Sequence, residues 1–434
     1  MMDYSAPRSL EDIVIDGLLA QAMVDRHFRQ FTGPVGGVEF NGERTADAHV
    51  DIRFHQVDPG VAPSAPARKK NTGLSVDASG FKVAEFSHNH WQFTTNQLDR
   101  FSAWAIPQLH NQPQELNPLL FAATRTLCGN RPIVIRAGDG TRPHEVIVVN
   151  YARNLAQNPA HSATVRDAII AFLSETPTRR TSSIPQVPQS VRTRNEKRAV
   201  LAYAAQQRQS VEWNATASAY QFDDGSLVQF RGNRIQSLST SGGQQVLSLP
   251  DIQADAFFLA AEHEMLVDAL MPRAQINLNL HAGTFTAQSG PKAVSGGALL
   301  IATCTPQTWT WAWADPFVAS LPISHGSHQV RHIGQAHGIV PLLRPHLPAE
   351  EADAAALYDV VKPILNHWVH LVAPLGTKNG EPVTGLFLAR SPQLQLAPSG
   401  SPLARQAQEA VLDIPVPSAL NADRARQAYS RFRV

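Results

Sequence analysis

The sequence has little cysteine and no excess of charge of either sign. Cys128 and Cys304 are its two cysteines among 434 residues, so a disulfide framework like those of small secreted domains is excluded. We expect two reduced thiols. Lys and Arg number 37 against 36 for Asp and Glu, which leaves a formal net charge of +1. Such a chain has no overall field that would favour nucleic acid, an anionic membrane or an acidic ligand.

Long hydrophobic runs are also missing. No apolar stretch approaches the roughly 18 residues that a helix needs to cross a bilayer. The first residues, Met1–Tyr4, are not a basic segment followed by an apolar one, so we expect no signal peptide. The sequence therefore predicts a cytoplasmic protein without membrane insertion.

The common catalytic motifs do not occur. The chain has no Gly-x-Ser-x-Gly elbow, no Gly-x-x-x-x-Gly-Lys phosphate loop, no Gly-x-Gly-x-x-Gly turn and no His-Glu-x-x-His pair. Catalytic groups are arranged in space rather than along the chain, so an enzyme is disfavoured but not excluded.

Composition divides the chain. Residues 176–198 are rich in Pro, Ser, Thr and Arg and have few large apolar side chains, which predicts an extended linker. The Pro-rich stretch at 57–73 is typical of an inserted loop. We predict an N-terminal domain at 1–175, the linker at 176–198, a C-terminal domain at 199–400 and a tail at 401–434.

Two pairs of segments suggest an internal repeat. Residues 9–16 resemble 248–255, and residues 81–93 resemble 299–311, in the same order and with a tryptophan at the same place. The second pair lies closer together in the sequence than the first. An insertion in the first half, the size of the stretch at 57–73, explains the difference. The sequence thus predicts one copied unit in each half.

Each half reads as a block of strands with helices before and after it. Alternating residues between 211 and 232 add a β-meander that we place at the start of the second domain, and a single helical stretch is expected at 349–372. The predicted class is α+β: two related domains, each a mostly antiparallel sheet with packed helices, joined by a Pro- and Arg-rich linker.

Three tryptophans occupy alternate positions, so in a strand they project from one face: Trp309, Trp311 and Trp313. Such a row suits either a stacking platform for sugars or bases, or the wall of a hydrophobic core. We favour the core, because the matching strand of the first half has a single tryptophan. In the alternative, the three tryptophans and the following Asp315 are the candidate ligand-binding residues.

From about Asp251 to Ala389 the sequence resembles an uncharacterised bacterial domain family of unknown function. The shared features are an early helix, a Trp-x-Trp-Ala-Trp strand that ends in proline, two helical segments, and a strand that ends in Leu-Phe-Leu-Ala. The signature here runs from Trp309 to Pro316, with Asp315 where asparagine is typical. The resemblance implies an architecture for the second half, and neither an activity nor catalytic residues.

Histidines are densest between His325 and His337. His328 and His332 would lie one turn apart on one helix face, a spacing that can chelate zinc. No carboxylate lies within this group, so we expect polar histidines on a helix surface rather than a metal site. Glu262 and Glu264 lie two residues apart and point away from each other on a helix, which predicts a solvated face and no acid/base pair.

These observations favour a non-enzymatic binding or scaffold protein without a cofactor. It would hold another protein or a small ligand in a groove or in the cleft between its domains. One alternative is a metal-assisted hydrolase that uses zinc in the His325–His337 region. The other is nucleic-acid binding through the basic linker and tail, which the near-neutral charge disfavours.

Overall fold

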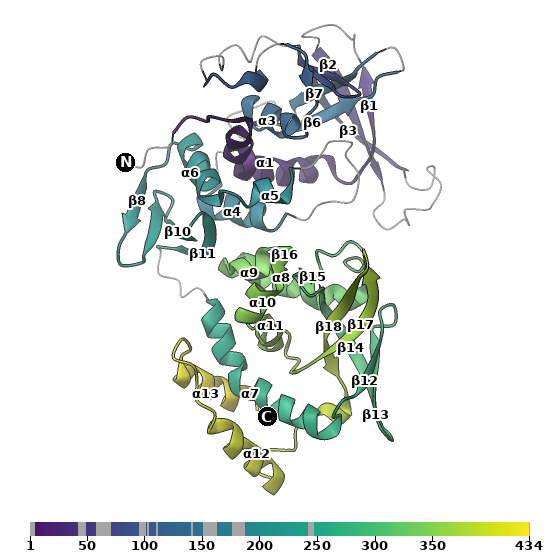
Figure 1. Cartoon of the computed structure of the whole chain (residues 1–434), viewed down its shortest axis with the longest axis vertical. Helices are drawn as coiled ribbons and strands as arrows, with labels where there is room; N and C mark the ends of the chain where they lie inside the picture. Colours follow the sequence, from purple (N-terminus) through teal and green to yellow (C-terminus); the bar gives the residue numbers. More distant parts are fainter. Residues whose placement is uncertain are drawn as a thin grey trace. The chain divides into compact units, whose positions relative to one another are not determined.

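The computed structural model describes residues 5–41, 49–57, 71–94, 101, 104–109, 112–139, 142–150, 163–175, 187–241 and 247–433. The chain forms two compact units, Met1–Gly242 and Gly243–Val434. Both are mixed α+β, with helices packed on an antiparallel sheet (Figure 1). Among the described residues, no helix is both long and apolar enough to span a membrane.

The first unit begins with the long helix α1 (Leu10–Thr32). The Ser9 side chain caps it by accepting a hydrogen bond from the Asp12 amide. A seven-stranded antiparallel sheet follows, together with α3 (Leu119–Leu127), which packs on α1. The strands are β1 (Val35–Asn41), β2 (His49–Val57), β3 (Asn71–Ser87), β4 (His90–Phe93), β5 (Gln114–Glu115), β6 (Ile133–Arg136) and β7 (His144–Asn150).

Three further helices and a four-stranded meander complete the described part of the first unit. The Asp224 carboxylate accepts the Val165 amide at 2.6 Å, and the Ser226 hydroxyl accepts the Arg166 amide at 3.1 Å, which ties the meander to the start of α4. The elements are α4 (Val165–Leu173), α5 (Gln189–Arg192), α6 (Glu196–Gln206), β8 (Val211–Asn214), β9 (Ala219–Phe222), β10 (Ser226–Arg231) and β11 (Arg234–Thr240). The meander therefore belongs to the first unit, whereas the sequence placed it at the start of the second domain.

The expected linker is also partly helical. Residues 176–186 lie outside the described part, and residues 187–198 contain α5 and the start of α6. Asn195 caps α6 by accepting the Arg198 amide, and the apolar face beyond it, which includes Val200 and Tyr203, is buried. The polar composition of the residues before this face concealed a helix that packs on α1.

The second unit opens with α7 (Leu249–Leu270), which Ser248 and Asp251 close with a reciprocal capping box. Its sheet also has seven antiparallel strands. They are β12 (Gln275–Asn279), β13 (Thr284–Ser289), β14 (Lys292–Cys304), β15 (Thr308–Trp311), β16 (His346–Pro348), β17 (Val369–Lys378) and β18 (Glu381–Arg390). The further helices are α8 (His325–His337), α9 (Val340–Leu343), α10 (Ala349–Ala354) and α11 (Leu357–Leu365).

The helix expected at 349–372 is instead two helices and the start of a strand. Ala356, at φ 45°, separates α10 from α11, and Asn366, at φ 51°, ends α11 in the left-handed conformation. β17 then begins at Val369. The sharp turn at Asn366 brings the first residues of β17 close to α7.

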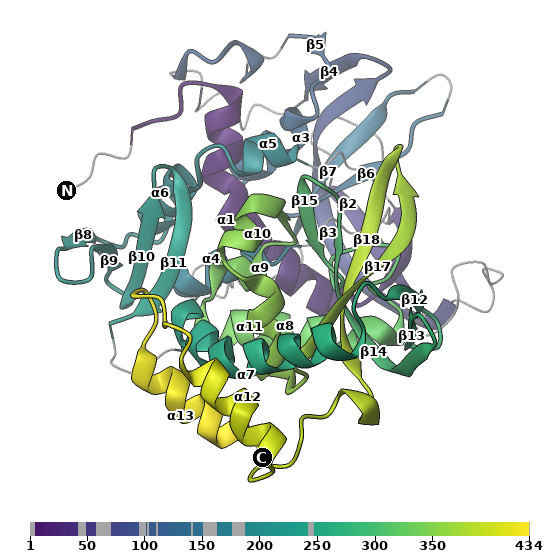
Figure 2. The ribbon, with the colours of Figure 1, turned by 60° about the horizontal axis from the view of Figure 1, so that its bottom comes forward.

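The tail forms two helices that pack on α7: α12 (Pro402–Leu412) and α13 (Ala422–Phe432) (Figure 2). Phe258 of α7, Val411 of α12 and Tyr429 of α13 share one buried cluster. The tail is thus part of the second unit.

The two sheets have the same pairing order. β1-β2-β3-β4-β5 is matched by β12-β13-β14-β15-β16, and the inner strands β3 and β14 each also pair with a second hairpin, β6–β7 or β17–β18. The pairing of β3 with β7 shifts register between Lys82 and Ala84, and that of β14 with β18 shifts between Leu300 and Ala302. The segments that look alike in the sequence thus occupy the same places in their sheets.

Candidate functional site

The three tryptophans lie in the core of the second unit. Trp309, Trp311 and Trp313 are 4%, 0% and 3% exposed and belong to one hydrophobic cluster. The rings of Trp309 and Trp311 meet edge to face at 5.3 Å, and Trp313 lies beyond the end of β15. In this fold the indoles are core side chains, and they offer no open surface for stacking on a ligand.

Asp315 holds the turn after β15. Its carboxylate accepts a hydrogen bond from the Thr303 hydroxyl at 2.6 Å and another from the Phe317 amide at 2.9 Å. The side chain is buried and both of its oxygens have partners within the unit. These contacts fix the chain where it leaves the sheet.

His328 and His332 lie on α8, as expected, but in different surroundings. The His328 Nε2 is 3.2 Å from the carbonyl oxygen of Ala319, whereas His332 is exposed. Within the described residues, the group of side chains with the spacing of metal ligands is a different one, formed by Glu264, Asp359 and His370.

A pocket of about 270 Å³ lies beside the second half of α7. One wall comes from α7 and the other from the turn into β17. The lining residues are His263, Glu264, Val267, Asp268, Trp368, Val369 and His370. The pocket is smaller than the sites that enclose whole drug-sized molecules, which are roughly 300–1,000 Å³.

A buried lysine lies behind the pocket. Lys362 of α11 has no exposed surface, and its Nζ lies 2.6 Å from Asp359 Oδ1 and 3.5 Å from Glu264 Oε1. His370 Nδ1 is 4.0 Å from the same Glu264 oxygen. The Tyr358 ring lies 5.4 Å from the His370 ring. One cation, two carboxylates and an imidazole thus form a compact cluster.

Burial controls the protonation of the pocket histidines. It lowers the pKa of His263 to about 4. It also lowers the pKa of His370 to about 4, and the positive charge of Lys362 acts in the same direction. Both imidazoles are therefore neutral at neutral pH.

The pKa of Glu264 shifts in the opposite direction. Burial raises the pKa of Glu264, the like charges of Asp359 and Asp268 raise it further, and Lys362 opposes them. The chemistry available at the pocket wall is therefore that of carboxylates and neutral imidazoles, without Ser, Thr, Cys or Lys among the lining residues.

Glu264, Asp359 and His370 are the ligand types that zinc accepts, and their ligand atoms lie within 4.8 Å of one another. The Lys362 ammonium, however, already lies between the two carboxylates. A divalent ion at the same place would meet this positive charge at close range, so the cluster in its present form suits an internal cation better than a metal.

The expectation of a solvated face is wrong for Glu262 and holds for Glu264, which is exposed. Glu262 is buried, where it accepts hydrogen bonds at 2.8 Å from Arg433 Nε and from the Tyr429 hydroxyl. Glu264 lines the pocket. One signal in the sequence was available: Lys362 lies within an otherwise apolar run, which is typical of a buried charge with a partner.

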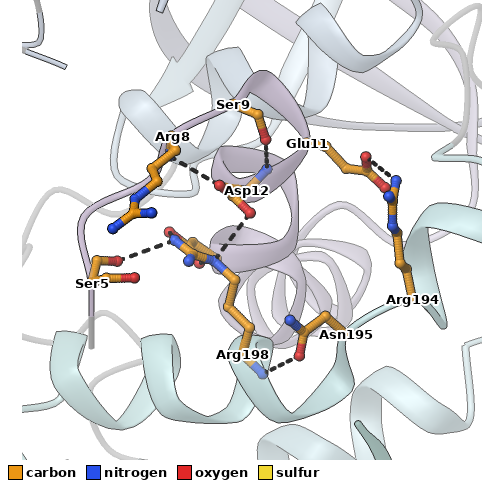
Figure 3. A network of polar contacts seen from close by, with 9 residues as sticks. Ser5, Arg8, Ser9, Glu11, Asp12, Arg194, Asn195 and Arg198 are labelled. Carbon is orange, nitrogen blue, oxygen red and sulfur yellow. Dashed lines mark hydrogen bonds and ion pairs between the residues drawn. The ribbon is translucent and has the colours of Figure 1, made fainter. Parts of the chain in front are cut away.

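Basic residues of the expected linker have acidic partners inside the first unit. Arg194 pairs with Glu11 at 2.5 Å, and Arg198 contacts Asp12 at the start of α1 (Figure 3). Arg192 pairs with Glu175 at 2.8 Å. Three of the basic residues on which the nucleic-acid alternative depended thus form ion pairs within the fold. Arg179 and Arg180 lie outside the described residues.

Comparison with family models gives a match within the second unit. Residues 250–392 match the model of a family described as "Family of unknown function (DUF6882)". This segment runs from the start of α7 to just beyond β18 and contains the pocket residues. No curated protein and no solved structure matches the chain.

Proposed function

We propose that the chain is a non-enzymatic binding or scaffold protein made of two related units, of which the second holds its ligand in the pocket between α7 and β17. The single observation that carries this proposal is a difference between the units. The pocket histidine His370 has an apolar residue, Ile133, at the matching position of the first unit, whereas the ion pair beside it is common to both units. Groups that the fold does not need in one copy are candidates for function in the other.

The relation between the units is supported by more than the order of their strands. Arg198 of α6 binds Asp16 of α1 through Nε at 2.7 Å and Nη2 at 2.8 Å. Arg424 of α13 binds Asp255 of α7 through the same two nitrogens, at 2.7 and 2.6 Å. Each unit therefore attaches its last long helix to its first by a bidentate Arg–Asp pair.

The same two helices also start alike. Asn195 accepts the amide of Arg198 at 3.0 Å, and Asn421 accepts the amide of Arg424 at 2.9 Å. Both helices read Asn-x-x-Arg-Ala-x-x-Ala-Tyr in their first turns. A shared cap, a shared ion pair and a shared apolar pattern support copying of a whole unit that includes this helix. In the second unit, that helix is the C-terminal tail.

An ion pair joins the first helix to a later helix in each unit. In the first unit Asp25 of α1 forms a bidentate pair with Arg125 of α3, at 2.5 and 2.9 Å. Glu264, which follows Asp255 at the same distance as Asp25 follows Asp16, instead meets a lysine of α11. An ion pair between these helices is therefore common to both units and is the part of the cluster that the fold requires.

The His370 imidazole is the part of the cluster that the second unit has and the first unit lacks. His370 lies opposite Leu388 in the β17–β18 hairpin, and Ile133 lies opposite Val148 in the β6–β7 hairpin. The register shifts described above make Leu388 and Val148 equivalent, so His370 corresponds to Ile133. Replacing an isoleucine with a half-buried polar ring brings no packing advantage, which supports a role in binding.

Binding is favoured over catalysis by the lining. The pocket wall has no hydroxyl, thiol or amine nucleophile, and the buried lysine is held by Asp359 behind the wall. Ligand-observed NMR with a fragment library of anionic, neutral and cationic compounds tests the proposal on the full chain. Val267→Phe, which places a ring in the pocket, is the blocked variant.

We expect pocket-binding fragments to lose their signal changes with Val267→Phe and to keep them with Val372→Phe, a substitution at an exposed position of β17 outside the pocket. A library without any fragment sensitive to Val267→Phe would contradict the proposal. So would turnover of generic ester or phosphoester substrates that His370→Ala abolishes.

A further inference from the structure

The pocket of the second unit has an excess of negative charge with nothing in its lining to balance it. Glu264 and Asp268 are one turn apart on α7, and both are exposed at the pocket. Like charges at this spacing destabilise a helix by about 0.2–0.5 kcal/mol. His263 and His370 add no positive charge at neutral pH, because burial lowers the pKa of each to about 4.

On this basis, and resting on the binding function proposed above, we propose that the pocket binds an organic cation, the ammonium or guanidinium group of an alkyl amine or alkyl guanidine. Its head would lie between the carboxylates of Glu264 and Asp268. Its stem would lie against the apolar side chains that complete the lining.

The remaining lining fits this class of ligand. Trp368 is 9% exposed and its ring packs against those of His263 and Phe432, so it adds apolar wall to the pocket rather than an open ring face. The Trp368 Nε1 donates to Asn366 Oδ1 at 3.1 Å, which holds the ring in place. Val267 and Val369 give apolar surface for methylene groups. A volume of about 270 Å³ suits a group the size of a lysine or arginine side chain.

An inorganic cation fits less well. A metal would need Asp359 along with Glu264, and the buried Lys362 Nζ lies 2.6 Å from the first and 3.5 Å from the second. Asp268 is the pocket carboxylate that Lys362 does not contact, and it lies on the exposed side of the pocket. An ammonium or guanidinium head on an apolar stem can contact Asp268 while its methylene groups lie against the apolar lining, whereas a small dication has no such stem.

Isothermal titration calorimetry on the full chain tests the proposal at low ionic strength. The probes are n-butylamine, agmatine, a short acetylated lysine amide, butyrate as the oppositely charged match of butylamine, and zinc chloride. We expect the amines and agmatine to bind, butyrate not to bind, and affinity to fall as salt is added. The free amine and the lysine amide distinguish a small metabolite from a partner side chain.

Asp268→Asn should weaken amine binding about fivefold, the effect of removing one charge at contact distance in water. Asp413→Asn, at an exposed position outside the pocket, is the matched control and should change nothing. Binding of butyrate in preference to the amines, equal amine affinity in Asp268→Asn, or tight zinc binding by the wild-type chain would overturn the cation proposal. These outcomes leave the binding function standing, whereas a pocket that takes no fragment of any charge removes both.

Discussion

Lys362 and Asp359 form an ion pair in which the Nζ and Oδ1 atoms are 2.6 Å apart and the lysine side chain has no exposed surface. The two residues lie one helical turn apart on α11, so the helix itself places them side by side. Glu264 reaches the same ammonium from α7. The cluster therefore links two helices that are far apart in the sequence.

Removing the two members of this pair should have unequal effects on stability. Asp359→Asn leaves a fully buried ammonium with Glu264 alone, whereas Lys362→Met leaves carboxylates that are 27% and 52% exposed and can bind water. We expect a loss of about 3 kcal/mol in the free energy of unfolding for Asp359→Asn and about 1 kcal/mol for Lys362→Met. Urea denaturation measures both. Equal losses, or a larger loss for Lys362→Met, would show that the buried ammonium does not depend on its partner more than the carboxylates do.

Lys362→Met should also create a zinc site. Without the ammonium, Glu264, Asp359 and His370 keep their mutual spacing and lose the charge that opposes a dication. At pH 7.5 the His370 ring is neutral, because burial lowers its pKa to about 4, so its lone pair is available. We expect zinc affinity at least about tenfold above that of the wild-type chain by calorimetry, which is about 1.4 kcal/mol. The double variant with His370→Ala is the control and should lose the gain.

Acid should weaken the second unit through His263. Burial lowers the pKa of this imidazole from 6.5 to about 4. Between these two values the unfolded chain binds a proton that the folded chain does not bind. The stability that is present above pH 6.5 is therefore lost as the pH falls towards 4. The loss is up to about 3 kcal/mol for this residue.

His263→Gln should reduce that pH dependence, measured as the free energy of unfolding between pH 7 and pH 4. His281→Gln changes an exposed histidine on the same unit and should leave the slope as it is. A slope that His263→Gln does not alter would mean that other groups cause the acid sensitivity.

The two bidentate pairs should have matching roles. Arg198→Lys and Arg424→Lys keep the charge but lose one of the two parallel hydrogen bonds to Asp16 or Asp255. We expect each to lower stability by about 1–2 kcal/mol. Hydrogen exchange should rise in α1 and α6 for the first variant, and in α7 and α13 for the second. Arg426→Lys, at an exposed position of α13, should leave exchange unchanged; effects confined to one of the two variants would argue against a common design.

The tryptophan row should behave as core. Trp311 has no exposed surface, and its Nε1 donates to the carbonyl oxygen of Pro341 at 3.1 Å. Trp311→Ala should lower the free energy of unfolding by about 3–5 kcal/mol. Trp213→Ala, which removes a tryptophan that is 57% exposed in the first unit, should change it by less than about 1 kcal/mol. A small loss at Trp311 would return the row to the candidate binding surfaces.

Much of the architecture was predictable because it depends on local pattern. Alternation of polar and apolar residues predicted most of the strands. Segments 81–93 and 299–311, which resemble each other, occupy the same places in the two sheets. The helix α6 was missed because its polar start resembles a linker and its buried face is short. Strand β17 was missed because the stretch at 349–372 was predicted as helix throughout, and the breaks at Ala356 and Asn366 depend on left-handed backbone conformations that neither residue type requires.

The pocket was not predictable for a different reason. Glu264 and His370 are separated by most of the second sheet in the sequence, and a turn within a run expected to be helical brings them together. Asp268 and Trp368 form no motif with them along the chain. Only Lys362, a lysine among apolar neighbours, gave a local signal in the sequence. It indicated a buried charge with a partner but did not identify the partner.

The position of Arg433 has a consequence for choosing the ends of a fragment. The segment that matches the family model ends at residue 392, before α12 and α13. A polypeptide trimmed to it would keep Glu262 on α7 and discard both Arg433 and Tyr429, the groups that bind this carboxylate. It would also bare the apolar side of α7 that Val411 and Tyr429 cover. Such a truncated product should be prone to self-association, and expression trials are better designed to run through the final helix.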